Sequence, residues 1–150
     1  MKYIWPILIF ILIVFVGIQF IPTKLNQSNE ISPSDITTVY HVPDTIQNIL
    51  KTSCYDCHSN NTNYPWYNKV QPVRWLLQRH IEGGKAELNF SEFGSYSKRR
   101  QKSKLKAMLG QIKNNDMPLW SYTIIHRNAK ITEKEKSRLI KWINTLRDSL

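Results

Sequence analysis

The first clear hydrophobic pattern is the uncharged run from Ile4 to Ile21, which consists mostly of Ile, Leu, Val and Phe. At about 1.5 Å per residue, a helix over this run would span roughly 27 Å, close to the thickness of a hydrocarbon core. The run exceeds the usual apolar region of a signal peptide, and no small-residue cleavage site precedes Pro22. We therefore expect a membrane anchor over residues 1–21, with Lys2 at its cytoplasmic end; a cleaved signal peptide and a buried core helix are the alternatives.

The polar, irregular stretch over residues 22–40 fits a stalk that lifts a following domain off the membrane. From residue 41 to residue 150, apolar positions at helical spacing predict helices, without strand alternation, hairpin dipeptides or internal repeats. We therefore expect a mainly helical domain with long loops. The predicted helices are Thr45–Lys51, capped by Asp44; Pro72–Ile81, ended by Gly83 and Gly84; Ser97–Lys113, with Met108 in its apolar stripe; and one opened by a capping box at Thr132–Glu135.

Length and charge narrow the possible functions. The chain has 150 residues, enough for one small domain and an appendage but not for a multi-domain enzyme. Lys and Arg number 21 against 11 Asp and Glu, and the segment from Tyr96 to Lys113 contains many of these cations and no acid. An exported domain rarely meets nucleic acid, so we expect this basic surface to meet an acidic redox partner or anionic lipid headgroups, or to be simply solvated. The sequence predicts no particular oligomeric state.

Both cysteines of the chain lie in one short motif, Cys54–His58, with the sequence CYDCH. At this C-x-x-C-H spacing two thiols reach the two vinyl groups of a haem, and the adjacent histidine presents a ring nitrogen to the iron. The alternatives are a zinc site, which would need more ligands at short spacing, a thioredoxin-like dithiol, which would need a βαβ context, and a plain disulfide. The motif predicts one c-type haem attached to Cys54 and Cys57, with His58 as an iron ligand.

The other face of the iron calls for a sixth ligand, and Met117 is the first candidate. Pro118 disfavours helical geometry at Met117, so the thioether should project from a loop. An isolated Met more often fills a core gap, and His80 is the alternative ligand. Iron held by His and Met has no vacant position and passes electrons, so we expect a carrier more readily than an enzyme. With a labile sixth ligand, the protein would instead be a haem-based peroxidase or a gas or redox sensor.

Aromatic and basic side chains near these ligands are candidates for haem contacts. Trp66, Tyr67 and Trp75 follow the motif and could wall the porphyrin, with ordinary core packing as the alternative. Arg74 could pair with a propionate, or lie on a solvated helix face. The weaker candidates are Tyr64, Trp120 and Tyr122 among the aromatics, Arg79 and Lys85 among the bases, and His41 and His126, which we expect to be solvated or capping residues.

Further segments share a family pattern with the motif: Asn63–Tyr67, Pro72–Trp75, His80–Lys85, Leu88–Ser91, Met117–Leu119 and Ala129–Glu135. Together with Cys54–His58 they resemble the bacterial haem-binding domain family of small, membrane-anchored, mono-haem c-type proteins. The resemblance covers residues 41–150 and implies a cytochrome-c-like helical domain with a distal Met that maps onto Met117. Because c-type haem is attached outside the cytoplasmic membrane, we expect a single-pass protein of the inner membrane with its C-terminal domain on the periplasmic side.

Overall fold

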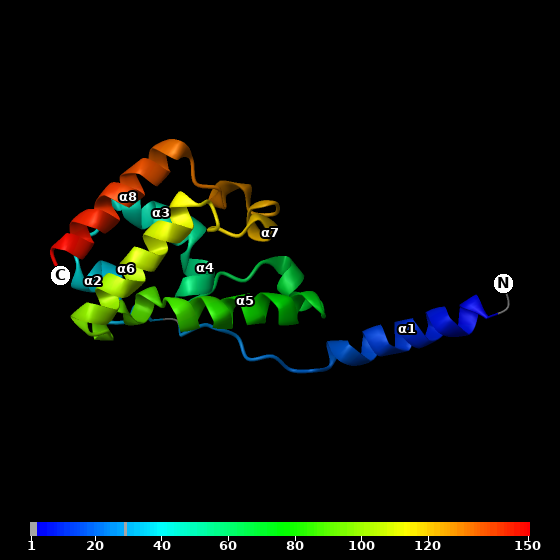
Figure 1. The fold of residues 1–150 in the computed structure, drawn as a ribbon. Coiled ribbons are helices and arrows are strands. Elements are labelled where there is room, and N and C mark those ends of the chain that lie inside the picture. The colour runs from blue at the N-terminus through cyan, green and yellow to red at the C-terminus, as the bar shows by residue number, and fades with distance from the viewer. Residues whose placement is uncertain (1–2, 29) are drawn as a thin grey trace.

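The structure is a computed structural model that describes residues 3–28 and 30–150. This part of the chain is mainly helical and contains no strand, as predicted; one isolated β-bridge pairs Gln27 with Asn61. Figure 1 shows a cluster of helices from which α1 extends to one side. The longer helices are α1 (Ile4–Gln19), α3 (Asp44–Ser53), α5 (Val73–Glu87), α6 (Lys98–Lys113) and α8 (Glu133–Asp148). The short helical segments are α2 (Ile36–Val39), α4 (Tyr55–His58), η1 (Trp66–Lys69), η2 (Phe90–Ser95), α7 (Trp120–Thr123) and η3 (Arg127–Ala129).

Helix α1 is shorter than the anchor expected at the N-terminus. It has 16 residues, roughly 24 Å of helix, whereas a membrane-spanning helix needs about 20 residues. No helix in the described part of the chain is long and apolar enough to cross a membrane, so the expected transmembrane helix is wrong. The helix ends where the Gln19 side chain turns to the domain: its Oε1 accepts the Gln71 N–H at 2.9 Å and its Nε2 donates to the Gln71 carbonyl at 3.2 Å. Lys2 lies outside the described residues.

Part of the expected stalk packs against the domain. Asn26 Nδ2 donates to the Ser59 carbonyl at 2.8 Å, just after the C-x-x-C-H motif. Asp35 Oδ1 accepts the Tyr55 O–H at 2.8 Å, and the Ile36 side chain is fully buried. The domain boundary at residue 41 stays a prediction. Residues before it nevertheless contribute a side chain to the core and hydrogen-bond partners to the motif and the residue after it.

The core lies where α6 and α8 pack side by side and α3 packs against α8 (Figure 1). Leu105 of α6 and Leu139 and Ile143 of α8 are fully buried. Met108 is 8% exposed and belongs to the same cluster, so it is a core residue as expected. Burying these side chains is the main stabilising contribution to the helical cluster.

Two of the predicted helix starts are confirmed and a third differs. Ser97 is the N-cap of α6, and Thr132 with Glu135 forms the capping box that begins α8. The Thr132 hydroxyl donates to Glu135 Oε2 at 2.6 Å and the Thr132 N–H donates to the same oxygen at 2.8 Å; the two bonds, the hydroxyl first, hold the pKa of that carboxyl below its ordinary value of 4.5. Helix α3 instead begins at Asp44 itself, with Pro43 at the N-cap and no capping side chain.

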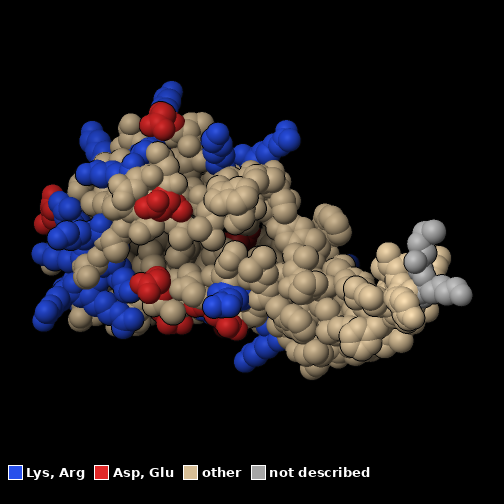
Figure 2. Space-filling model, turned by 45° about the vertical axis from the view of Figure 1, so that its right-hand side comes forward, with Lys and Arg blue, Asp and Glu red and all other residues tan. Residues whose placement is uncertain are grey.

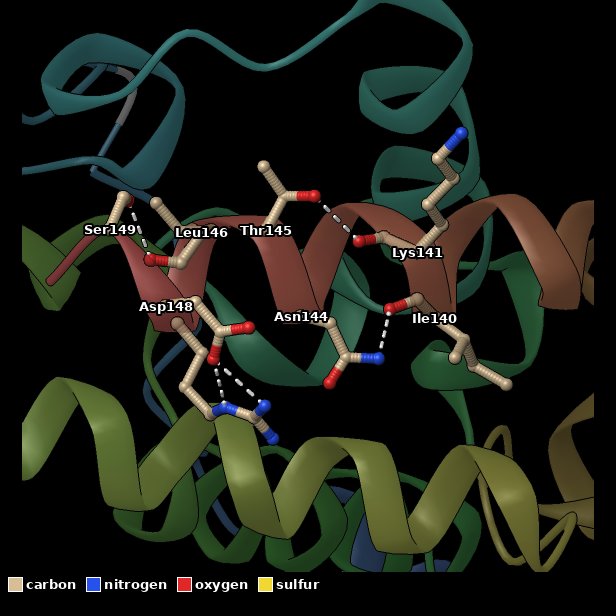
Figure 3. Close-up of polar contacts among 8 residues, drawn as sticks. Ile140, Lys141, Asn144, Thr145, Leu146, Asp148 and Ser149 are labelled. Atoms are coloured by element: carbon tan, nitrogen blue, oxygen red, sulfur yellow. Dashed lines mark hydrogen bonds and ion pairs between the residues drawn. The ribbon is translucent and has the colours of Figure 1, made fainter.

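Polar side chains on α8 bond back to carbonyl groups of the preceding turn (Figure 3). Asn144 Nδ2 donates to the Ile140 carbonyl at 3.0 Å, and Thr145 Oγ1 donates to the Lys141 carbonyl at 3.1 Å. These donors are satisfied within the helix. Asn144 and Thr145 therefore do not contribute to the contacts between α8 and the rest of the domain through these bonds.

Helix α5 continues through the glycine pair at which we expected it to end. It runs to Glu87, and Gly84 lies against the motif helix α4. A Cβ at Gly84 would stand 2.6 Å from the Cys57 carbonyl oxygen, closer than van der Waals contact allows. The glycine is therefore required by the close approach of two helices and does not mark a helix end.

Gly84→Ala should lower the free energy of unfolding by about 1–3 kcal/mol, because the new methyl group must push α5 away from α4. Gly83→Ala is the matched control, because a Cβ there would meet nothing within 4 Å. That variant should be neutral or more stable by up to about 1 kcal/mol, since alanine favours helix over glycine. Chemical denaturation followed by circular dichroism measures both; equal stability of the two variants would contradict the packing argument.

Candidate functional site

A cavity of about 560 Å³ lies against α4 and α5 and is lined as well by residues of the loop and helix at α7. Its volume falls in the range of about 300–1,000 Å³ that is usual for cofactor and small-molecule sites. Cys54, Cys57 and His58 of the motif all line it, and so does Met117. In Figure 1, α7 faces α5 and α4 across this region. The fold thus brings the two sets of predicted ligands to one cavity.

The imidazole of His58 is held in one orientation. Its Nδ1 lies 2.9 Å from the Leu88 carbonyl oxygen, which can only accept, so Nδ1 carries the proton. The ring also packs against Phe90 in a T-shaped arrangement, at 6.2 Å between ring centroids. Burial lowers the pKa of His58, opposed by hydrogen bonds to backbone at Leu88 and Gly84. A neutral ring with Nδ1 engaged leaves the Nε2 lone pair for a metal, the usual arrangement of a histidine ligand.

The two thiols lie in surroundings that keep them protonated. Burial, followed by the nearby Cys57, raises the pKa of Cys54 to about 12. Burial, followed by the charge of Asp56, raises the pKa of Cys57 to about 11. A catalytic dithiol instead depends on a lowered thiol pKa, so these values argue against thioredoxin-like chemistry.

The zinc alternative also lacks its ligand set. Among residues 3–28 and 30–150, no three or more His, Cys, Asp and Glu side chains come together as a metal site would require. A structural zinc ion takes four protein ligands. Haem iron is already held by the porphyrin nitrogens and needs only one or two ligands from the chain, which the motif and its cavity can provide.

Both candidates for the sixth ligand line the cavity. Met117 is partly buried in the loop between α6 and α7, where the sequence predicted it. His80 is partly buried on α5. Met117 and Pro118 also line a second cavity of about 340 Å³. Met117 and His80 therefore both remain candidates for the sixth iron ligand. Met117 lies between the two cavities.

The predicted porphyrin contacts divide into two groups. Tyr67 lines the cavity, whereas Trp66 and Trp75 do not and are 77% and 38% exposed. Arg79 lines it, whereas Arg74 does not, because its Nε donates to a carbonyl of η1 at 2.6 Å. Of the weaker candidates, Tyr122 lines the cavity, and Tyr64, Lys85, Trp120, His41 and His126 do not.

Apolar side chains of the cavity wall are left open to solvent. Val73, Leu76 and Ile125 line the cavity and are 41%, 57% and 60% exposed. Neighbouring exposed apolar groups around a hollow are typical of a ligand site. A flat apolar group such as a porphyrin would cover them. The apolar lining is therefore compatible with haem, as are the candidate ligand atoms.

Two hydrogen bonds at the cavity wall join residues that the sequence does not indicate to be neighbours. Tyr122 Oη donates to Asp56 Oδ2 at 2.5 Å, and Tyr67 Oη lies 2.7 Å from His126 Nε2. The Tyr122 and His126 rings stack at 4.3 Å between centroids. His126 is thus held by two aromatic residues, where we expected solvent exposure or capping. The partners are about 60 residues apart in sequence, so no local pattern indicates these bonds.

Comparison with known proteins gives one match. A family model described as a haem-binding domain matches residues 13–145. No match was found among curated proteins, nor among solved structures. The matched range contains the motif and its cavity, and it also includes the end of α1 and the whole segment of residues 22–40.

Proposed function

Because the chain belongs to the haem-binding domain family, we propose that it holds one c-type haem, joined by thioethers to Cys54 and Cys57 and ligated by His58, and that it carries electrons. Met117 is the proposed sixth ligand. The observation that carries the proposal is that one cavity unites two thiols, an imidazole whose Nδ1 is bonded to the Leu88 carbonyl and a thioether, brought there by separate segments of the chain. Because c-type haem is attached outside the cytoplasmic membrane, the proposal implies that the domain works there.

When bound, a haem with His and Met on its iron exchanges one electron and keeps no position open for another ligand. The residues of this chain orient the iron ligand and provide the contacts that would hold the haem. His58 is oriented by the Leu88 carbonyl, so its nitrogen does not have to reorganise. Val73 and Leu76 offer apolar surface to a flat group. Arg79 lines the same cavity and is available to a carboxylate there.

The basic surface of α6 supports an acidic redox partner. Lys and Arg gather most densely at the end of the domain away from α1 (Figure 2). In the described part of the chain, the one ion pair made by α6 joins Lys104 to Glu87, at 3.7 Å. Glu87 also lines the cavity, so this surface begins at the edge of the proposed haem site. Opposite charge on a partner would steer brief encounters toward that edge and make their rate fall with rising salt.

A haem sensor or peroxidase with a labile sixth ligand is the second candidate. It is supported by the position of Met117 in a loop between two cavities, because a methionine that moves from one to the other would leave the iron open. The two functions differ in whether the sixth position is closed at rest.

Exposure of the reduced, haem-loaded full-length protein to carbon monoxide tests the proposal. An electron carrier should keep its ferrous absorption spectrum unchanged, because Met117 occupies the sixth position. Rapid and complete conversion to a carbon-monoxide complex would overturn the electron-carrier proposal in favour of the sensor or peroxidase. Haem that comes away on extraction with acidified acetone would overturn covalent attachment independently of this result.

A further inference from the structure

The hydrogen bond between Tyr122 and Asp56 joins two parts of the site that are remote in sequence. Asp56 stands inside the C-x-x-C-H motif, on α4, and Tyr122 stands on α7, five residues after Met117. Tyr122 Oη donates to Asp56 Oδ2 at 2.5 Å, while Asp56 Oδ1 accepts the Asn63 N–H at 3.1 Å. Both oxygens of the carboxylate are therefore engaged, and one of them holds α7 to the motif.

A second contact reinforces this link. His126 follows α7 by three residues and is bonded to Tyr67 of η1, with 2.7 Å between Nε2 and the hydroxyl oxygen. The Tyr122 ring stacks on His126 with an angle of 17° between the ring planes. Within the described residues, two side-chain hydrogen bonds attach the segment 117–129 to α4 and η1. One is made by Tyr122 and the other by His126.

The methionine arm, residues 115–122, is held at both ends. At its start, Lys136 Nζ donates to Asn115 Oδ1 at 2.6 Å and to the Lys113 carbonyl at 3.1 Å. At its end stands the bond from Tyr122 to Asp56. Met117, Pro118 and Leu119 lie between these two points and all line the cavity. Because the stretch is so short, the position of Tyr122 limits how far Met117 can move.

We propose that Tyr122 and Asp56 are positioning residues for the sixth ligand: their hydrogen bond keeps Met117 at the cavity, and its loss lets the methionine leave. This inference rests on the proposed function. A hydrogen bond from a hydroxyl to a carboxylate is among the stronger ones in proteins, and it acts here at the end of the loop that carries Met117. Removing it should raise the fraction of molecules in which the sixth position is open, and apparent affinity for an added ligand rises with that fraction.

Tyr122→Phe tests the inference, because it removes the hydroxyl and keeps the ring that stacks on His126. Tyr55→Phe is the matched control: it also removes a tyrosine-to-aspartate hydrogen bond at the motif, to Asp35 at 2.8 Å, but Tyr55 does not line the cavity. In the reduced, haem-loaded full chain, Tyr122→Phe should raise the affinity for carbon monoxide about tenfold or more, and Tyr55→Phe should leave it within about twofold. Equal affinities in the two variants would overturn the inference.

Combining Tyr122→Phe with Met117→Ala shows whether Tyr122 acts through the methionine. If it does, the double variant should bind carbon monoxide as Met117→Ala does. A further increase of similar size in the double variant would overturn the positioning role. Met117→Ala without effect on spectrum or affinity would instead overturn the methionine ligation itself, so the two failures are distinguishable.

If Tyr122→Phe does not fold, Asp56→Asn is the second variant, because it keeps an acceptor of the same size without its charge. It should raise the affinity for carbon monoxide by a smaller factor than Tyr122→Phe would. An unchanged affinity would count against the inference.

Discussion

Haem should be fully extractable by acidified acetone from a variant in which both Cys54 and Cys57 are replaced by serine. Without thiols no thioether can form, and the haem would be held only by its axial ligands and by apolar contact with the cavity wall. That wall is partly open, since Leu76 and Ile125 remain more than half exposed. The variant should therefore lose haem during purification, whereas the unaltered protein should keep all of it after extraction.

Intact mass and the absorbance of the extracted pellet measure this result together. Each single cysteine variant should retain one thioether and a fraction of the haem. Ser53→Ala is the matched control, because Ser53 lines the same cavity beside Cys54 and supplies no attachment atom. Haem that stays with the chain after loss of both cysteines, or that leaves the unaltered protein, would rule out attachment at this motif.

Met117→Ala is expected to abolish the weak far-red absorption band that arises from charge transfer between sulfur and ferric iron. The midpoint potential should also fall, on the order of 100 mV or more, because a thioether favours ferrous iron and axial ligands set haem potentials over a range of about 0.8 V. Potentiometric titration followed by absorption spectroscopy measures both effects.

His80→Ala is the matched control, because His80 lines the same cavity from α5. It should change neither the far-red band nor the potential by a comparable amount. The opposite pattern, with Met117→Ala silent and His80→Ala altering the spectrum, would assign the sixth position to His80.

Local patterns predicted the parts of the fold that depend on local interactions. The capping box at Thr132 and the apolar stripe of α6 are confirmed, because both arise from residues a few positions apart. The motif also identified the cavity wall, since its five residues are contiguous. Met117 could be proposed from its proline neighbour, and the structure brings it to the same cavity.

The errors come from contacts between distant residues. The glycine pair predicts a helix end, but Gly84 is the point where α5 contacts the Cys57 backbone, and the sequence does not display that contact. The N-terminal apolar run predicts a membrane span, yet its helix ends at Gln19, whose side chain forms hydrogen bonds with the Gln71 backbone. The bond from Tyr122 to Asp56 joins residues 66 positions apart and could be found only in three dimensions.

The packing of the segment before residue 41 decides how short the protein can be made. A version trimmed to the domain suggested by the sequence would lose Ile36 from the interior and the bond from Asn26 to the Ser59 carbonyl, just after His58. Measurements on such material would describe a domain that lacks part of its own packing around the C-x-x-C-H motif. Biochemical work on this protein should therefore keep the chain from at least Asn26 onward, even where α1 is removed.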